Sequence, residues 1–127
     1  MKTNGKLIIT ESLFVENYSF SRGSSLLGDY TKANIYVNNS TFLRNKAYYG
    51  GVFFAHYSSS INFDNCTFKE NFAIRGSIGS VDNNGFFTIK SSIISENSAF
   101  ISSVAHVVES FDQMTTINNT IIRNNYF

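Results

Sequence analysis

A nine-residue segment recurs five times in this chain of 127 residues, and no other feature restricts the possible folds as strongly. Each copy opens with an apolar residue, has Ser, Cys or Thr in the fourth place and Phe or Ile in the sixth, and ends in Asn. The copies are ITESLFVEN (9–17), VNNSTFLRN (37–45), FDNCTFKEN (63–71), IKSSIISEN (89–97) and INNTIIRNN (117–125). The first and last intervals between copies are slightly longer than the two in the middle, which are equal. A near-constant period of this length is typical of stacked-repeat proteins.

Each repeat contains three short segments with the pattern of β-strands. Around the opening of a copy, apolar residues alternate with polar ones, as in Ile61, Asn62 and Phe63, which indicates a strand with one buried face. A second strand is predicted around the sixth place, and a third follows a Gly/Ser turn, at 52–54, 78–80 and 104–106. Three strands with their corners in so short a repeat leave no room for hairpins, and they fit one triangular turn of a parallel β-helix.

The sequence therefore predicts an all-β fold, a right-handed parallel β-helix of about five coils with three short strands per coil. The handedness follows the rule for parallel crossovers. We expect a single domain over residues 1–127 that forms part of a longer stack or a larger assembly. The sixth-place side chains should stack at the ~4.8 Å spacing between strands. The predicted inward residues are Ile9, Phe14, Val37, Phe42, Val52, Phe63, Phe68, Ile78, Ile89, Ile94, Val104 and Ile117.

Asparagine occurs 16 times, and proline is absent. A chain without proline offers a backbone N–H at every position, as continuous hydrogen-bonded ladders require. We predict that the ninth-place asparagines hold a turn in left-handed or bridge geometry and stack their amides from coil to coil. A row of polar ligands is the alternative. This structural ladder consists of Asn17, Asn45, Asn71, Asn97 and Asn125.

Two motifs resemble those of a known family. The FxxN spacing occurs at 14–17, 42–45 and 68–71, and GGV stands at 50–52. These are similar to the FxxN and GGA(I/L/V) repeats of the polymorphic outer membrane protein family, and more broadly to right-handed parallel β-helices of the pectin-lyase-like kind. The resemblance implies a surface-exposed stalk or adhesin, extracellular or at the cell surface. The chain departs from the family where the glycine pair becomes Gly76-Ser77 and Ser102-Ser103.

Composition excludes several classes of function. Ten Lys and Arg against nine Asp and Glu give a net charge of +1, so the chain lacks the excess positive charge expected of a nucleic-acid-binding protein. The longest apolar run, 52–55, is far below the ~20 residues of a transmembrane helix. Leu7–Ile9 is too short for the apolar core of a signal peptide, so we expect no signal peptide.

Cys66 is the only cysteine, and we predict that it is a small buried residue. No cofactor or metal is predicted.

One corner of the repeat gathers acidic, aromatic and histidine residues after the third strand. Both of the longer intervals are expected to place their two extra residues here, around 28–34 and 109–114, and insertions on one edge often mark a binding face. Solvated loop residues are the alternative. His106 is instead expected to face inward, in register with Leu26 and Phe54. The candidate binding corner consists of Asp29, Tyr30, His56, Tyr57, Asp82, Glu109 and Asp112.

These features favour a non-enzymatic structural or interaction module, a β-helical stalk or adhesin-like scaffold that contributes a rigid repeat surface to a larger assembly. The alternative is a carbohydrate-active β-helix protein, a uronate-polysaccharide lyase or epimerase or a glycan-binding module, that uses the corner around Asp29, His56, Asp82 and Asp112. The expected partners are other protein subunits or further coils of the same polypeptide on the open ends, where strand edges need covering. A glycan is a further candidate partner, and no nucleic acid is expected.

Overall fold

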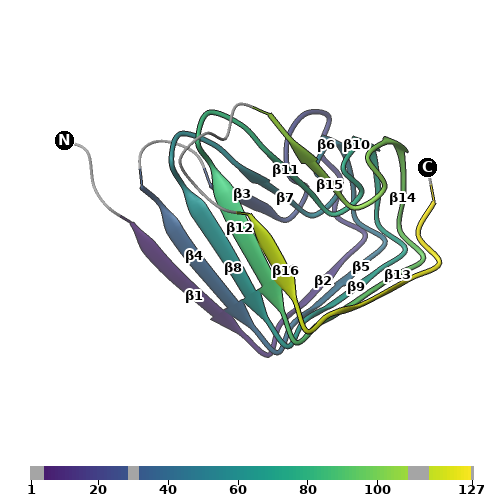
Figure 1. The fold of residues 1–127 in the computed structure, drawn as a ribbon, viewed down its shortest axis with the longest axis horizontal. Coiled ribbons are helices and arrows are strands. Elements are labelled where there is room, and N and C mark those ends of the chain that lie inside the picture. Colours follow the sequence, from purple (N-terminus) through teal and green to yellow (C-terminus); the bar gives the residue numbers. More distant parts are fainter. Residues whose placement is uncertain (1–4, 29–31, 109–114, 127) are drawn as a thin grey trace.

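The computed structural model describes residues 5–28, 32–108 and 115–126, and within these ranges it contains β-strands and no helix (Figure 1). All paired strands are parallel. They form four sheets. Sheet A contains β1 (Lys6–Thr10), β4 (Asn34–Asn38), β8 (Ser60–Asp64), β12 (Phe86–Lys90) and β16 (Thr116–Asn118). Sheet B contains β2 (Leu13–Val15), β5 (Thr41–Leu43), β9 (Thr67–Lys69), β13 (Ile93–Ser95) and β17 (Ile121–Arg123). Sheet C contains β6 (Lys46–Tyr49), β10 (Phe72–Arg75) and β14 (Ser98–Ile101). Sheet D contains β3 (Leu26–Gly28), β7 (Phe53–Ala55), β11 (Gly79–Val81) and β15 (Ala105–Val107).

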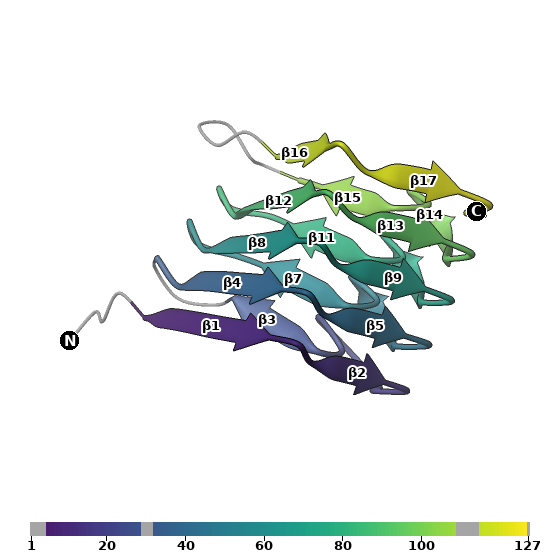
Figure 2. The same cartoon turned by 90° about the horizontal axis from the view of Figure 1, so that it is seen from below.

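The chain visits sheets A, B, C and D in turn and then returns to sheet A one layer further along, so it winds into a parallel β-solenoid of about four turns. Figures 1 and 2 together show that the winding is right-handed and that the layers follow one another from the N-terminus to the C-terminus. The predicted fold class is confirmed. Two details differ, because a complete turn has four strands where three were predicted, and the stack has about four turns where five were predicted.

The additional strand lies directly after the ladder asparagine. Residues 46–49 were expected to lead into a turn, but they form β6, in which Ala47 is buried while Lys46 and Tyr48 are exposed. The same alternation places Ala73 and Ala99 inward in β10 and β14. Sheet C is therefore a strand layer with its own outer face.

Two corners in each turn are held by residues with positive φ. Between sheets A and B these are Glu11, Asn39, Asn65, Ser91 and Asn119, with φ from 47° to 53°. Between sheets B and C they are Glu16, Arg44, Glu70, Glu96 and Asn124, with φ from 52° to 59°. The predicted turn is held in left-handed geometry, but the residue with positive φ is the one before the ladder asparagine. The reason is geometric, because the left-handed residue points outward, as exposed Arg44 does, and the next side chain then turns into the interior.

The five ninth-place asparagines form a continuous row of hydrogen bonds. Asn71 Nδ2 donates to Asn97 Oδ1 at 2.9 Å in the next turn and to the Phe42 carbonyl at 3.0 Å in the previous turn. Asn71 Oδ1 accepts from Asn45 N at 2.9 Å and from Asn45 Nδ2 at 3.0 Å. The side chain thus makes four hydrogen bonds while fully buried. The pattern extends to both ends of the row, Asn17 and Asn125.

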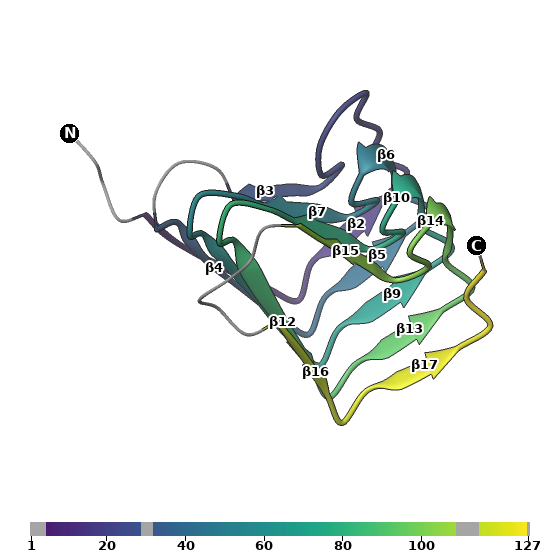
Figure 3. The ribbon, with the colours of Figure 1, turned by 45° about the horizontal axis from the view of Figure 1, so that its top comes forward.

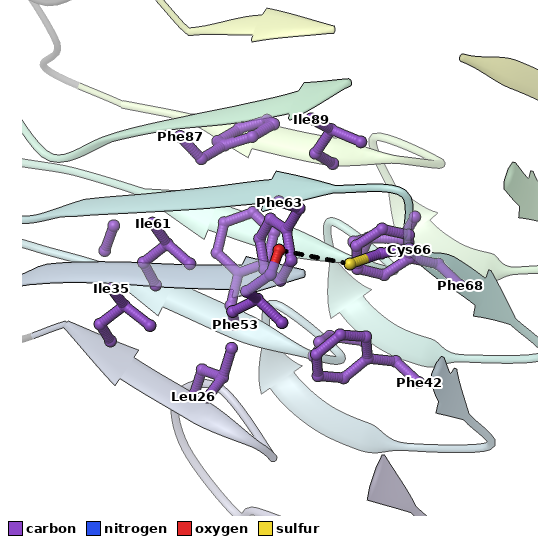
Figure 4. Packing of buried hydrophobic residues seen from close by; sticks show 14 of the residues in the cluster. Leu26, Ile35, Phe42, Phe53, Ile61, Phe63, Cys66, Phe68, Phe87 and Ile89 are labelled. Atoms are coloured by element: carbon purple, nitrogen blue, oxygen red, sulfur yellow. Dashed lines mark hydrogen bonds between the residues drawn. The ribbon is translucent and has the colours of Figure 1, made fainter. Parts of the chain in front are cut away.

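Aromatic and aliphatic side chains fill the interior in columns (Figure 4). The rings of Phe14 and Phe42 stack with centroids 4.8 Å apart, and those of Phe42 and Phe68 with centroids 5.2 Å apart. The predicted inward residues are confirmed, with Ile9, Phe14, Val104 and Ile117 only partly buried and the others fully buried. The core also contains residues outside that list, of which Ile61 already stood out in the alternating pattern: Leu26, Ile35, Phe53, Ala55, Ile61, Val81 and Phe87.

Cys66 is buried among these side chains, as expected. Its Sγ atom lies 3.5 Å from the carbonyl of Val37 (Figure 4). Burial raises the pKa of the Cys66 thiol. A neutral thiol in this place acts as a small packing residue.

A third corner, between sheets C and D, depends on glycine. Gly50 and Gly76 have φ of 63° and 65°. A Cβ atom on Gly50 would lie 1.8 Å from the carbonyl oxygen of Phe53, and one on Gly76 would lie 2.0 Å from that of Gly79. Ser102 occupies the equivalent place in the last turn with φ of 58°. The glycine motif therefore has a steric cause.

The strand register corrects the placement of the first insertion. Tyr18 pairs with Lys46 and Arg22 pairs with Tyr49. Segment 18–22 is therefore one residue longer than segment 46–49, against which it lies. That extra residue lies beside sheet C. Only the second extra residue lies after Gly28. Gly28 pairs with Ala55 and Asn34 pairs with Ser60, so the connection from sheet D to sheet A is one residue longer here than in the next turn. The insertions do not all gather in the predicted corner.

Candidate functional site

The predicted binding corner is only partly described. Asp29, Tyr30, Glu109 and Asp112 lie outside the described residues. The structure brings the other three together: His56 Nε2 lies 2.9 Å from Asp82 Oδ1, and the ring centroids of His56 and Tyr57 are 3.6 Å apart. Asn83 Nδ2 lies 2.7 Å from the same histidine nitrogen.

The imidazole and carboxylate of this pair could exchange a proton. His56, however, is only 5% exposed, and it connects the loop after β7 with the loop after β11. A ring that is buried and already partnered holds two coils together more readily than it reaches a substrate. Among the described residues, no group of three or more His, Cys, Asp or Glu side chains is placed to hold a metal ion.

His106 lies on the other side of the sheet from the prediction. Its register partners are Ser80, Phe54 and Leu27, which alternate with the inward residues of sheet D. Leu26 instead pairs with Phe53, so the predicted alignment with Leu26 is wrong by one residue. A one-residue shift moves a strand side chain to the opposite face. His106 therefore faces outward.

His106 lines a groove on the outside of the solenoid, where sheet C meets sheet D. Figure 3 shows β6, β10 and β14 standing at an angle to β7, β11 and β15. The groove has a volume of ≈ 220 Å³. We call it the arginine groove, and its lining residues are Arg22, Tyr49, Phe54, Arg75, Ser80, Asp82, His106 and Val108.

Cations and aromatic rings alternate in the arginine groove. Arg22, Tyr49 and Arg75 occupy one column in successive turns. The Arg22 guanidinium lies 4.8 Å from the Phe54 ring centroid, and that of Arg75 lies 5.7 Å from the Tyr49 centroid. Phe54 faces outward yet is only 2% exposed, in keeping with the guanidinium over its ring.

Two nitrogen atoms in the arginine groove have no hydrogen-bond partner within the described part of the chain. They are Nε of Arg75 and Nε2 of His106, and both atoms are buried. Burial, and to a lesser extent the nearby charge of Arg75, lowers the pKa of His106. A neutral imidazole and a charged guanidinium therefore share this space near neutral pH.

A second outer surface lies on sheet C. Side chains that alternate with Ala47, Ala73 and Ala99, together with two from the preceding turn, form a mainly apolar surface with a shallow hollow of ≈ 320 Å³ that Lys46 also lines. Phe20 is 87% exposed and Phe100 is 70% exposed. We call this surface the aromatic strip, and its residues are Tyr18, Phe20, Tyr48, Phe72, Ile74 and Phe100.

Comparisons with family models, with curated protein sequences and with solved structures find no match to this chain. The fold therefore defines the class, a parallel β-solenoid. Within the described residues, no helix has the length and apolar character needed to cross a membrane.

Sequence reasoning missed both outer surfaces. The signal for the arginine groove was present as the column of Arg22, Tyr49 and Arg75, which recurs at nearly the period of the repeat. This column becomes visible only when the segments that follow the ladder asparagines are treated as strands and aligned with one another. The signal for the aromatic strip was the alternation in KAYY, FAIR and SAFI, which has the same requirement.

Proposed function

We propose that this chain is a non-enzymatic structural and interaction module, a β-helical stalk or adhesin-like scaffold that presents a rigid repeat surface to a partner. The observation that carries the proposal is the aromatic strip on the outer face of sheet C. The resemblance of the FxxN and GGV motifs to polymorphic outer membrane protein repeats supports a surface-exposed role.

Exposed aromatic side chains on a fixed sheet are suited to binding. Aromatic residues are enriched in the cores of protein interfaces, and contiguous exposed apolar patches mark interaction sites. Behind the strip, Ala47 and Ala73 are packed against the interior, and the adjacent asparagine ladder fixes the corner. A partner therefore meets side chains that need little ordering, which lowers the entropic cost of association.

The second candidate is a carbohydrate-active β-helix protein, either a uronate-acting lyase or epimerase or a glycan-binding module. The observation that favours it is the position of Asp82, which lines the arginine groove together with Arg22 and Arg75. Such chemistry needs a carboxylate and a cationic or histidine group on one face. We rank it second because the described histidine beside Asp82 is buried.

A solid-phase binding assay tests the first proposal. The purified chain is applied to surfaces coated with fibronectin, laminin, collagen or purified glycans. We expect retention on at least one protein coat, and a loss of about tenfold or more in the double variant Phe20→Ser/Phe100→Ser, which corresponds to removing interface anchors. Ile93→Ser is the matched control, because Ile93 is 37% exposed on the outer face of sheet B. Retention on no coat, or equal loss in the control, would contradict the proposal.

A turnover assay separates the two candidates. Polygalacturonate and alginate are incubated with the chain and Ca²⁺, and unsaturated products are followed by ultraviolet absorbance. We expect no turnover. Turnover that Asp82→Ala abolishes would replace the first proposal with the second.

A further inference from the structure

The arginine groove and the aromatic strip are neighbours. Tyr48 belongs to the strip and Tyr49 to the groove, and their ring centroids are 4.8 Å apart. Both residues lie at the end of β6, so a partner that covers the strip also reaches the groove. The chemistry of the groove therefore restricts what the partner can present there.

The two arginines of the groove make no ion pair with a carboxylate of the described residues, in contrast to Arg44, Lys69 and Lys90 elsewhere. The buried Nε of Arg75 has no acceptor among the described residues, and an unsatisfied buried donor costs free energy. Asp82 lines the same groove, but its Oδ1 lies 2.9 Å from His56 Nε2. The groove thus offers charged donors that an external anion can satisfy.

The size of the groove decides between a side chain and a polymer. Its volume of ≈ 220 Å³ is below the roughly 300–1,000 Å³ of typical small-molecule sites. It accommodates one acidic side chain, whereas a chain of sugar residues would need a longer channel. Arginine beside aromatic residues is also the combination found at the energetic centres of protein interfaces.

We propose that the arginine groove is a carboxylate-binding site that takes an Asp or Glu side chain of a protein partner seated on the aromatic strip. This inference rests on the proposed interaction function and specifies the chemistry of the partner. Arg75 donates to the carboxylate through its guanidinium, and the guanidinium of Arg22, two turns away with Tyr49 between them, lines the same groove. Charge-assisted hydrogen bonds of this kind are stronger than neutral ones.

His106 provides a reporter inside the groove. The charged groups that line the groove together with His106 are Arg75 from β10, Arg22 from the first turn and Asp82 from the loop after β11. The pKa of His106 is lowered by burial and by Arg75. A carboxylate bound between them adds a negative charge, which favours the imidazolium, so binding should raise the pKa of His106.

The test is a nuclear magnetic resonance titration of the His106 ring in the whole chain. The probes are the tripeptides acetyl-Gly-Glu-Gly-amide and acetyl-Gly-Gln-Gly-amide, with galacturonate as a third ligand. We expect the Glu peptide to shift the ring signals and raise the pKa of His106, and the Gln peptide to do neither. Arg75→Gln should weaken the Glu peptide about tenfold or more, as for loss of a charged hydrogen bond. Arg75→Lys keeps the positive charge and removes the guanidinium, so it tests whether the planar guanidinium is needed for binding. Arg123→Gln, on the exposed end of β17, is the matched control and should leave binding of the Glu peptide unchanged.

Equal responses to the Glu and Gln peptides, or an unchanged affinity in a folded Arg75→Gln variant, would refute the inference. Galacturonate binding more tightly than the Glu peptide would reassign the groove to acidic sugars and refute the protein partner. The strip variant Phe20→Ser/Phe100→Ser keeps the two proposals apart, since it should bind the Glu peptide normally while losing surface retention. Failed peptide binding with intact retention overturns only the inference. Intact peptide binding without retention overturns only the proposed function.

Discussion

Removal of one amide from the middle of the asparagine ladder should destabilise the whole solenoid. Asn71→Ala deletes four side-chain hydrogen bonds, two donated and two accepted. At a net value of about 0.5–1.5 kcal/mol each, the loss is about 2–6 kcal/mol, and we expect about 4. The backbone N–H of Asn45 loses its Asn71 acceptor inside the stack, which keeps the cost above the lower end of this range.

The assay is equilibrium unfolding in urea, followed by circular dichroism. With a slope of about 2 kcal/mol per molar urea, a loss of about 4 kcal/mol moves the midpoint down by about 2 M. Asn17→Ala is the matched control within the ladder, because its Nδ2 makes one ladder hydrogen bond, to Asn45 Oδ1 at 2.9 Å, in a partly buried position. We expect that variant to lose about 1 kcal/mol.

The comparison between these two positions carries the test. If Asn71→Ala and Asn17→Ala cost the same, or if Asn71→Ala costs less than about 1 kcal/mol, the ladder does not stabilise the stack as its geometry implies. An unchanged slope in both variants is needed for the comparison, because a changed slope would indicate loss of two-state unfolding.

Three further predictions concern single positions. Gly76→Ser should destabilise the chain by more than about 1 kcal/mol, and Ser102→Gly should stabilise it by up to about 1 kcal/mol, because both residues hold positive φ; urea midpoints measure both. Cys66 should resist a thiol reagent until urea unfolds the chain, because the thiol is buried with a raised pKa; rapid labelling in buffer would contradict this. The lowered pKa of His106 means that the unfolded chain binds more protons as the pH falls through about 6.5, so stability should fall there, and less steeply in His106→Gln; equal slopes would refute it.

Much of the fold followed from the sequence, because a stacked fold requires each column to keep its character. Phe14, Phe42 and Phe68 recur because each ring must pack on the ring of the adjacent turn. The period therefore indicated the parallel solenoid and the inward columns, and the Asn at each ninth place correctly marked a row of stacked amides. Local pattern also indicated the buried place of Cys66.

The outer surfaces were decided by tertiary structure. Whether Tyr48 and Phe100 face solvent depends on the left-handed residues Arg44 and Glu96, which determine which side chains of sheet C point outward. The repeat pattern predicted a turn at the ladder asparagine but did not identify the preceding residue as the left-handed one. The arginine groove depends on the angle between sheets C and D, which brings Arg22, Arg75 and His106 together from three different turns. A period specifies which residues share a column. It does not specify how steeply the chain bends between columns, and that bend determines which outward side chains meet.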